Sequence, residues 1–256
     1  MNTTDSRPWL AMTFDDGFVN NLNFALPIIE KYEAPTTIFV LSAPLQNEKF
    51  VNWADLIDVL VRRKDAKSIK FLGDSYELRL GRFVSTADEA RTLVDAIKDA
   101  GPERCAELDS MMAMLWQDRQ LSRDYEGHFR LMNREELRKC SSSPFIEIGS
   151  HSKLHYNLGR MTDEVAKRDL LESKSELENA LQVPIDSIAY PDGDYTEITK
   201  NIAETLGYSR QLAVTFRLPS DQNDNRIRRR FSYSNSTTHE SNMLRMGMQW
   251  ASNYTK

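Results

Sequence analysis

Two adjacent carboxylates and a pair of histidines are the residues of this chain whose types and spacing point to chemistry. Asp15 and Asp16 directly follow one apolar run, and His151 and His155 follow another. One carboxylate with two imidazoles is a set of metal ligands, and a second carboxylate beside it can serve as a base. Each pattern alone also has an ordinary explanation, as a solvated turn or as surface rings. Together they predict a metal site with a neighbouring base.

The exact form of the histidine motif argues against one class of metalloenzyme. Zinc metalloproteases with the His-x-x-x-His spacing carry Glu directly after the first histidine. Ser152 occupies that position here. The motif therefore does not support a zinc protease.

A third element of the same kind lies further along the chain. The apolar run that begins at Ser187 ends at Tyr190 and continues as the turn Pro191-Asp192-Gly193. In a turn of this kind backbone N–H groups can be left unpaired and face a ligand. Alone it is only a turn, but it ends a strand-like run as the other two elements do.

The three elements resemble the motifs of the polysaccharide deacetylases of carbohydrate esterase family 4. The first motif, TFDDG, is complete at 13–17, the second is complete as HSKLH at 151–155, and the third is partial. The resemblance extends from about Trp9 to about residue 230 and includes the stretch Trp53-Ala54-Asp55. It implies an α/β fold, a distorted and incompletely closed (β/α) barrel that normally has seven strands.

The resemblance also implies roles for the motif residues. Asp16, His151 and His155 would hold one divalent metal ion, with zinc as the expected ion, and Asp15 would be the general base. The backbone N–H of Asp192 would face the oxyanion. Contacts to the substrate would come from the rest of the same turn, at Tyr190, Pro191 and Gly193.

Two family features are missing from their usual places. The third motif often begins with an arginine that orients the base, and this position is Ala189. Some relatives carry the arginine later, and among Arg228 to Arg230 we take Arg229 as the candidate. The late motif that supplies a histidine as general acid is not recognisable. His239 is the only histidine late enough to replace it.

The function implied is removal of an N-acetyl group from an amino sugar. We expect a nucleotide- or lipid-linked intermediate of surface polysaccharide, such as O-antigen or lipopolysaccharide, as the substrate. Deformylation and amide hydrolysis of a non-sugar compound are variants of the same chemistry. The alternative from another class is a carbohydrate-binding or scaffold protein that has lost turnover, and a proton donor at the site would distinguish the enzyme from the binder.

The pattern along the chain indicates elements that could position these residues. Strand-like and helical runs alternate, which favours a parallel sheet with the site at the carboxyl ends of its strands. We expect a single domain that spans 1–256. Two alternating runs predict a hairpin at 68–80, and the pattern at 85–140 predicts helices. We expect 68–140 to be an insertion in this domain. Thr86 to Glu89 has the form of a capping box for a helix that Gly101 ends.

Composition is that of a globular protein and excludes several classes. The chain has 256 residues, of which 40% are hydrophobic, and no apolar stretch approaches the length of a membrane span. Its net charge of -5 argues against non-specific binding to nucleic acid. The polar N-terminus, Met1 to Pro8, has no hydrophobic signal region, so we expect a cytoplasmic protein without stable membrane insertion.

Overall fold

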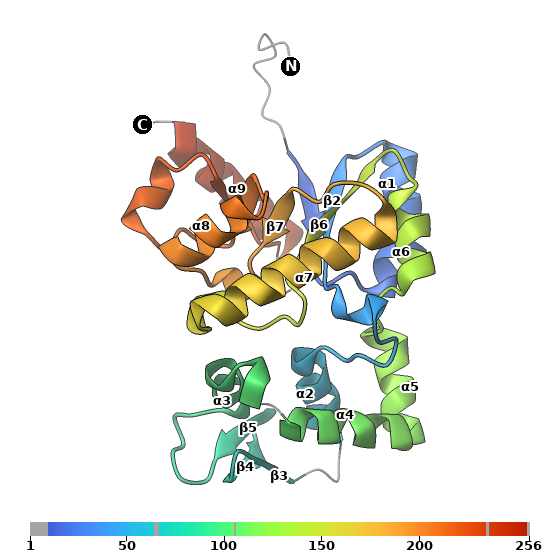
Figure 1. The fold of residues 1–256 in the computed structure, drawn as a ribbon, viewed down its shortest axis with the longest axis vertical. Coiled ribbons are helices and arrows are strands. Elements are labelled where there is room, and N and C mark those ends of the chain that lie inside the picture. The colour runs from blue at the N-terminus through green and yellow to red at the C-terminus, as the bar shows by residue number, and fades with distance from the viewer. Residues whose placement is uncertain (1–9, 64–66, 105, 234–235, 255–256) are drawn as a thin grey trace.

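A parallel sheet forms the centre of the computed structural model, which describes residues 10–63, 67–104, 106–233 and 236–254 (Figure 1). Its six strands lie in the order β1-β2-β6-β7-β8-β9. Their bounds are Met12–Phe14, Thr36–Val40, Ile146–Ser150, Ser187–Ala189, Arg210–Ala213 and Ile227–Arg229. Each neighbouring pair is parallel. Residues 1–9, where we expect no targeting segment, lie outside the described part.

The sheet curls without closing, as a distorted and incompletely closed (β/α) barrel does. The described residues contribute six strands to it, where the family resemblance implies seven. The fold class predicted from the sequence is thus confirmed, with a smaller sheet. Because all strands run in the same direction, the loops after β1, β6 and β7 emerge at one edge of the sheet.

Four of the described helices contribute buried residues to the apolar core of this sheet. They are α1 (Leu26–Tyr32), α6 (Arg134–Ser141), α7 (Asp163–Leu181) and α8 (Glu197–Thr205). The chain ends its described part with α9 (His239–Tyr254). Thr162 in the sequence predicts a capped helix that runs to about Leu181, and α7 confirms it, with Leu170 and Leu177 buried on its inner side. Among the described helices, none has both the length and the apolar character needed to span a bilayer.

A second group of elements forms its own core next to the loop edge of the sheet. It consists of α2 (Trp53–Arg62), the antiparallel strands β3 (Ser68–Phe71), β4 (Asp74–Arg79) and β5 (Arg82–Ser85), and the helices α3 (Leu93–Ala100), α4 (Ala106–Gln117) and α5 (Arg119–His128). We call this segment, 53–128, the inserted module; the insertion predicted at 68–140 stays a prediction, and the end of that range belongs to α6. In Figure 1 it lies at the end of the molecule away from both chain termini. Its core also includes Val51 and Tyr156, which flank the module and the histidine loop. Helix α6, in contrast, packs on α7 and β6.

Local details of the inserted module differ from the sequence prediction. The hairpin predicted at 68–80 exists, but a third strand, β5, extends it. The capping box predicted at Thr86 is wrong, because the Ser85 hydroxyl accepts the N–H groups of Ala87 and Asp88 and holds a turn there. The helix begins later, after Thr92, where Thr92 and Asp95 form the capping box.

Candidate metal centre and neighbouring base

The loops after β1 and β6 lie close together because the end of β2, the strand between them, hydrogen-bonds to both loops. Residue Phe14 ends β1, and Ser150 ends β6. The N–H of Leu41, directly after β2, donates to the carbonyl of Asp16 at 3.3 Å, and the N–H of His151 donates to the carbonyl of Val40 at 2.8 Å. The two motifs, far apart in sequence, therefore lie on either side of the end of one strand.

Asp16, His151 and His155 form a compact set of potential metal ligands. One ligand atom from each residue can be chosen so that all three lie within 4.8 Å of one another. Asp16 Oδ1 is 3.3 Å from His155 Nε2 and 3.7 Å from His151 Nε2. The structure thus brings together the three residues that the sequence predicts as metal ligands.

A backbone carbonyl orients the His151 ring, and two side chains hold the main chain of His155. His151 Nδ1 lies 2.7 Å from the carbonyl of Ala189, which holds the proton on that nitrogen and leaves Nε2 facing Asp16. His155 has a φ of 60°, in the left-handed region, where a non-glycine residue needs support. The Ser152 hydroxyl accepts the His155 N–H at 3.0 Å, and the Trp53 indole donates to the His155 carbonyl at 3.0 Å.

The chemistry of this set fits a divalent metal ion. Asp16 Oδ1 is buried and has no hydrogen-bond partner in the described part of the chain, although two ring nitrogens lie close to it. Burial, followed by the charge of His151, lowers the pKa of His155, so that the ring is neutral, the form that binds metal. A carboxylate oxygen and two imidazole nitrogens are a ligand set of catalytic zinc sites, which keep an open position.

Asp15, the predicted base, points to a different partner from Asp16. Arg230 donates two hydrogen bonds to its carboxylate, from Nη1 to Oδ1 at 2.6 Å and from Nη2 to Oδ2 at 2.7 Å. Asp15 Oδ2 is also 3.9 Å from His151 Nε2. Burial raises the pKa of Asp15, but the charge of His151 and the hydrogen bonds and charge of Arg230 outweigh it and lower that pKa below its ordinary value. The carboxylate is therefore ionised and oriented beside the metal ligands.

The structure brings Arg230, and not Arg229, to the base. Arg230 begins the loop after β9, and its guanidinium also lies over the Phe39 ring, 5.6 Å from the centroid. The Arg229 guanidinium instead lies 5.9 Å from the centroid of Phe216. Alternation along the strand, which sends successive side chains to opposite faces, separates these two neighbours.

Arg230→Lys tests the orienting contact. Lysine keeps the positive charge but loses the two-point geometry. We expect kcat to fall about 10- to 100-fold with little change in KM, as for the loss of a charge-assisted hydrogen bond worth about 1.5 to 3 kcal/mol. Steady-state kinetics of Arg230→Lys beside Arg229→Lys provide the measurement. A larger loss for Arg229→Lys would return the orienting role to Arg229.

Helix α7 supports the histidine loop from the side opposite the sheet. Asp169 Oδ1 accepts the N–H of Lys153 at 2.9 Å, and the Lys153 ammonium contacts Glu172 and Glu176, each at 2.8 Å. Burial raises the pKa of Asp169 to about 6, against the hydrogen bonds from the backbone of Lys153 and Leu154, which lower it. This carboxylate holds the loop between His151 and His155, the two histidines of the candidate metal site.

Asp169→Ala should weaken metal binding without touching a ligand. Loss of an outer-shell partner typically costs about 10- to 100-fold in metal affinity, and we expect a change of that size. Competition for zinc between the protein and a chromophoric chelator measures it. Glu164→Gln, an exposed position on the same helix, is the matched control and should bind zinc as the wild type does.

The third motif lies at the end of β7, close to the cluster. Asp192 has a φ of 54° and Gly193 a φ of 64°, and the N–H of Gly193 closes the turn onto the carbonyl of Tyr190. The Asp192 carboxylate lies 3.0 Å from the ammonium of Lys98 in α3, so the inserted module contacts this turn directly. The negative charge of Asp192 also acts on His155.

Two predicted site residues occupy other environments. Tyr190 is fully buried, its hydroxyl donates to Gln211 at 2.7 Å, and its ring stacks on Tyr195. The side chain of Tyr190 therefore belongs to the core and cannot contact a substrate; Pro191 and Gly193 are also buried, which leaves backbone atoms for that purpose. His239 is exposed and lies 2.9 Å from the Tyr233 hydroxyl, outside the metal-ligand cluster.

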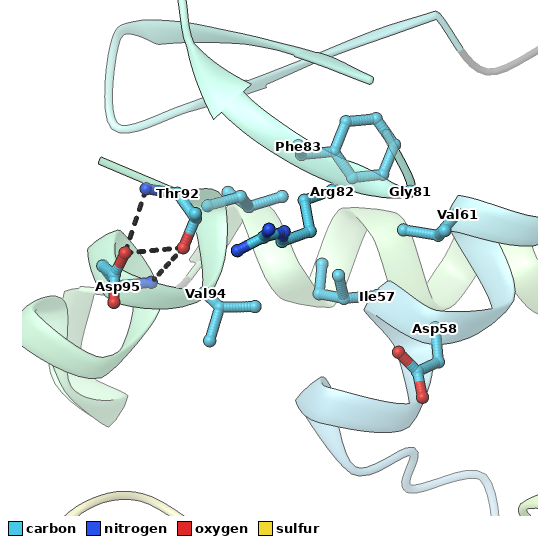
Figure 2. Close-up of a pocket in the computed structure, with 10 residues that line it drawn as sticks. Ile57, Asp58, Val61, Gly81, Arg82, Phe83, Thr92, Val94 and Asp95 are labelled. Atoms are coloured by element: carbon cyan, nitrogen blue, oxygen red, sulfur yellow. Dashed lines mark hydrogen bonds between the residues drawn. The ribbon is translucent and has the colours of Figure 1, made fainter. Parts of the chain in front are cut away.

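Two cavities lie in or beside the inserted module. One, of about 310 Å³, is at the junction with the histidine loop and is lined by Trp53, Met112, Leu154 and other residues. The other, of about 320 Å³, lies between α2, β5 and α3, where Ile57, Arg82, Phe83 and Val94 line it (Figure 2). None of the three candidate metal ligands lines the second cavity.

Comparisons with known proteins agree with this architecture. A family model described as polysaccharide deacetylase matches residues 112–210. The curated protein YxkH of Bacillus subtilis (strain 168), whose name places it among the polysaccharide deacetylases, is 30% identical over 89 residues, which are 35% of this chain and 31% of YxkH.

Solved structures share the fold at low identity. BA0330 of Bacillus anthracis, named in the same way, gives a TM-score of 0.51 at 14% identity and is matched over 91% of this chain and 49% of its own. The deacetylase PplD of Streptococcus pyogenes, solved in complex with acetate, gives a TM-score of 0.47 at 16% identity, over 83% of this chain and 59% of its own. The chain thus spans about half the length of BA0330. Residues 112–210 are thus similar in sequence to the polysaccharide deacetylase family, and the chain shares the fold of BA0330.

Proposed function

We propose that this protein is a metal-dependent hydrolase that removes an N-acetyl group from an amino sugar. The observation that carries the proposal is the joint placement of a three-ligand cluster, Asp16 with His151 and His155, and an ionised carboxylate, Asp15, held by Arg230. An amide is a poor electrophile, so its hydrolysis needs both an activated water and stabilisation of the charge that develops on the acyl oxygen.

The residues of the site divide this work. A divalent ion bound at the cluster supplies Lewis-acid polarisation and lowers the pKa of water. Asp15 accepts the proton of the attacking water, and Arg230 keeps its carboxylate in one orientation as that happens. The backbone N–H of Asp192 donates to the acyl oxygen as negative charge develops there.

The same geometry supports turnover over carbohydrate binding alone. A protein that only binds carbohydrate does not need an arginine hydrogen-bonded to a carboxylate beside the metal ligands. The guanidinium N–H groups that contact the carboxylate are then not available as donors to a sugar. Here both Nη atoms of Arg230 are occupied by Asp15. An oriented base is instead what a hydrolytic site requires.

For the substrate, we propose a nucleotide- or lipid-linked amino sugar, an intermediate of surface polysaccharide, O-antigen or lipopolysaccharide assembly, with zinc as the bound ion and the cytoplasm as the site of action. The proposal rests on the stretch Trp53-Ala54-Asp55, which resembles relatives that act on surface-glycan intermediates. The basic cluster near β9 adds little support, since Arg226 contacts Asp224, Glu197 and Glu204 and Arg230 contacts Asp15.

Acetate release from a panel of sugars tests the activity. The panel contains free, nucleotide-linked and lipid-linked N-acetyl amino sugars and their N-formyl counterparts, each assayed with metal-stripped and zinc-reloaded protein. We expect acetate from at least one linked N-acetyl sugar after reloading only. Formate without acetate would make the protein a deformylase, and no acyl release by fully metal-loaded protein would contradict the hydrolase assignment.

A further inference from the structure

We propose that Asp55, which the inserted module contributes, donates the proton to the leaving amine. This inference rests on the proposed N-deacetylase function and adds a catalytic residue to it. Breaking the C–N bond requires a proton on nitrogen, because an amide anion is too basic to leave. The late histidine, His239, lies on the surface paired with Tyr233 and does not supply it.

The first turn of α2 is fixed against the metal-ligand loop. The Trp53 indole N–H donates to the carbonyl of His155 at 3.0 Å, and the two rings lie 6.3 Å apart. Trp53 also stacks on Tyr156, with ring centroids 6.1 Å apart. Asn52 caps the helix by accepting the N–H of Ala54, so the direction of the first turn is set from both sides.

Asp55 lies on this turn as a buried and partly unpartnered acid. Only 8% of the residue is exposed, and its Oδ2 has no hydrogen-bond partner in the described part of the chain. Its helix turn contacts the His155 loop through Trp53, and the negative charge of Asp16 is one of the causes that raise the pKa of Asp55. A buried polar atom normally has a partner, so an unpaired oxygen at a site of this kind indicates a group kept for a ligand.

The environment of Asp55 favours the protonated form, which a donor must have. Burial, then the charges of Asp16 and Asp58, raises the pKa of Asp55 to about 8. Tyr125, on α5, also faces this group, and the Asp55 charge in turn raises the pKa of that tyrosine. Cationic charge at the cluster would offset the contribution of Asp16, but burial, the largest cause, does not depend on it.

The two carboxyl groups of the site then balance the reaction. Asp15 takes one proton from the attacking water, and the remaining hydroxyl forms the new C–O bond. As the C–N bond breaks, the Asp55 carboxyl group gives its proton to nitrogen. Acetic acid and the free amine result, with Asp15 protonated and Asp55 ionised, and proton exchange with solvent restores both. A neutral acid beside an ionised base is a recurring arrangement in hydrolases.

Substrates with different leaving groups test this role. Asp55→Asn keeps nearly the same shape and removes the acid, and Asp74→Asn, an exposed position on β4 of the same module, is the matched control. We expect Asp55→Asn to lower kcat/KM for the N-acetyl sugar by about 100- to 10,000-fold. Hydrolysis of 4-nitrophenyl acetate, whose leaving group needs no proton, should be unchanged, and Asp74→Asn should resemble the wild type on both substrates.

The previous comparison mixes an amide with an ester. A series of substituted phenyl acetates repeats the test within one reaction type, ester hydrolysis. In Asp55→Asn the rate should fall more steeply with the basicity of the leaving phenol than in the wild type. Rates are expressed per bound zinc, and thermal unfolding confirms that the variant is folded. An equal loss on the sugar and on 4-nitrophenyl acetate would overturn the inference, because it would indicate a structural or metal-binding role. Unchanged sugar deacetylation would overturn it as well.

Failure of the proposed function gives a different result. Zinc-loaded wild type would then release no acetate from any N-acetyl sugar, whatever its activity on phenyl acetates. The inference about Asp55 would fall with it. If the wild type deacetylates the sugar and only the Asp55 comparison fails, the N-deacetylase assignment stands and the proton donor lies elsewhere.

Discussion

Asp16→Ala is expected to abolish stoichiometric zinc binding and acetate release together. Asp16 Oδ1 is the oxygen that both imidazole Nε2 atoms approach, and it is buried without another partner in the described structure. Its removal leaves two neutral ring nitrogens and no anionic ligand. Loss of Lewis-acid stabilisation worth about 4 kcal/mol or more corresponds to a rate reduction of about 1,000-fold or more.

Metal analysis after zinc loading and gel filtration provides the measurement, with acetate release assayed on the same samples. His155→Ala should behave in the same way. His128→Ala is the matched control, because this exposed histidine on α5 lies outside the cluster. Full zinc occupancy in Asp16→Ala, or wild-type turnover in the zinc-free protein, would contradict the metal site.

The parts of the fold that could be predicted are those encoded in local patterns. Alternating strand and helix runs indicated a parallel sheet, and a capping threonine located the start of α7. The start of α3 could not be read in this way, since Thr86 and Thr92 both precede an acidic residue three positions on. Ser85, the last residue of β5, holds residues 86–88 in a turn. The helix therefore cannot begin after Thr86 and begins after Thr92.

Some residues of the site could be predicted from short motifs, whereas others depend on the tertiary structure. The metal ligands could be predicted because a short motif contains two of them and its spacing is specific. The choice between Arg229 and Arg230 depends on the register of β9 against β8, where Ala213 pairs with Arg229 and accepts the N–H of Arg230. Tyr190 could not be placed either, because its burial results from helices and strands distant in sequence.

Asp55 is the clearest case of a residue that only the tertiary structure connects to the site. The sequence resemblance included it without a role, and more than 90 residues separate it from His151. The inserted module has its own core, so α2 can be positioned as a rigid unit, and Trp53 and Lys98 each join that unit to a loop of the site. We therefore infer that the module is part of the proposed active site.

Asp15→Asn should lower kcat about 100- to 10,000-fold while zinc binding stays at the wild-type level. Asparagine has nearly the same shape, but it cannot accept the proton of water, and its amide offers Arg230 one acceptor oxygen where the carboxylate offers two. Because the pKa of Asp15 is lowered, the wild type keeps its base ionised throughout the neutral range, whereas turnover by Asp15→Asn should rise with hydroxide concentration. Zinc-normalised pH–rate profiles of both proteins provide the measurement. Equal kcat in the two proteins would remove Asp15 from the mechanism, and a parallel loss of zinc would make it a ligand and not a base.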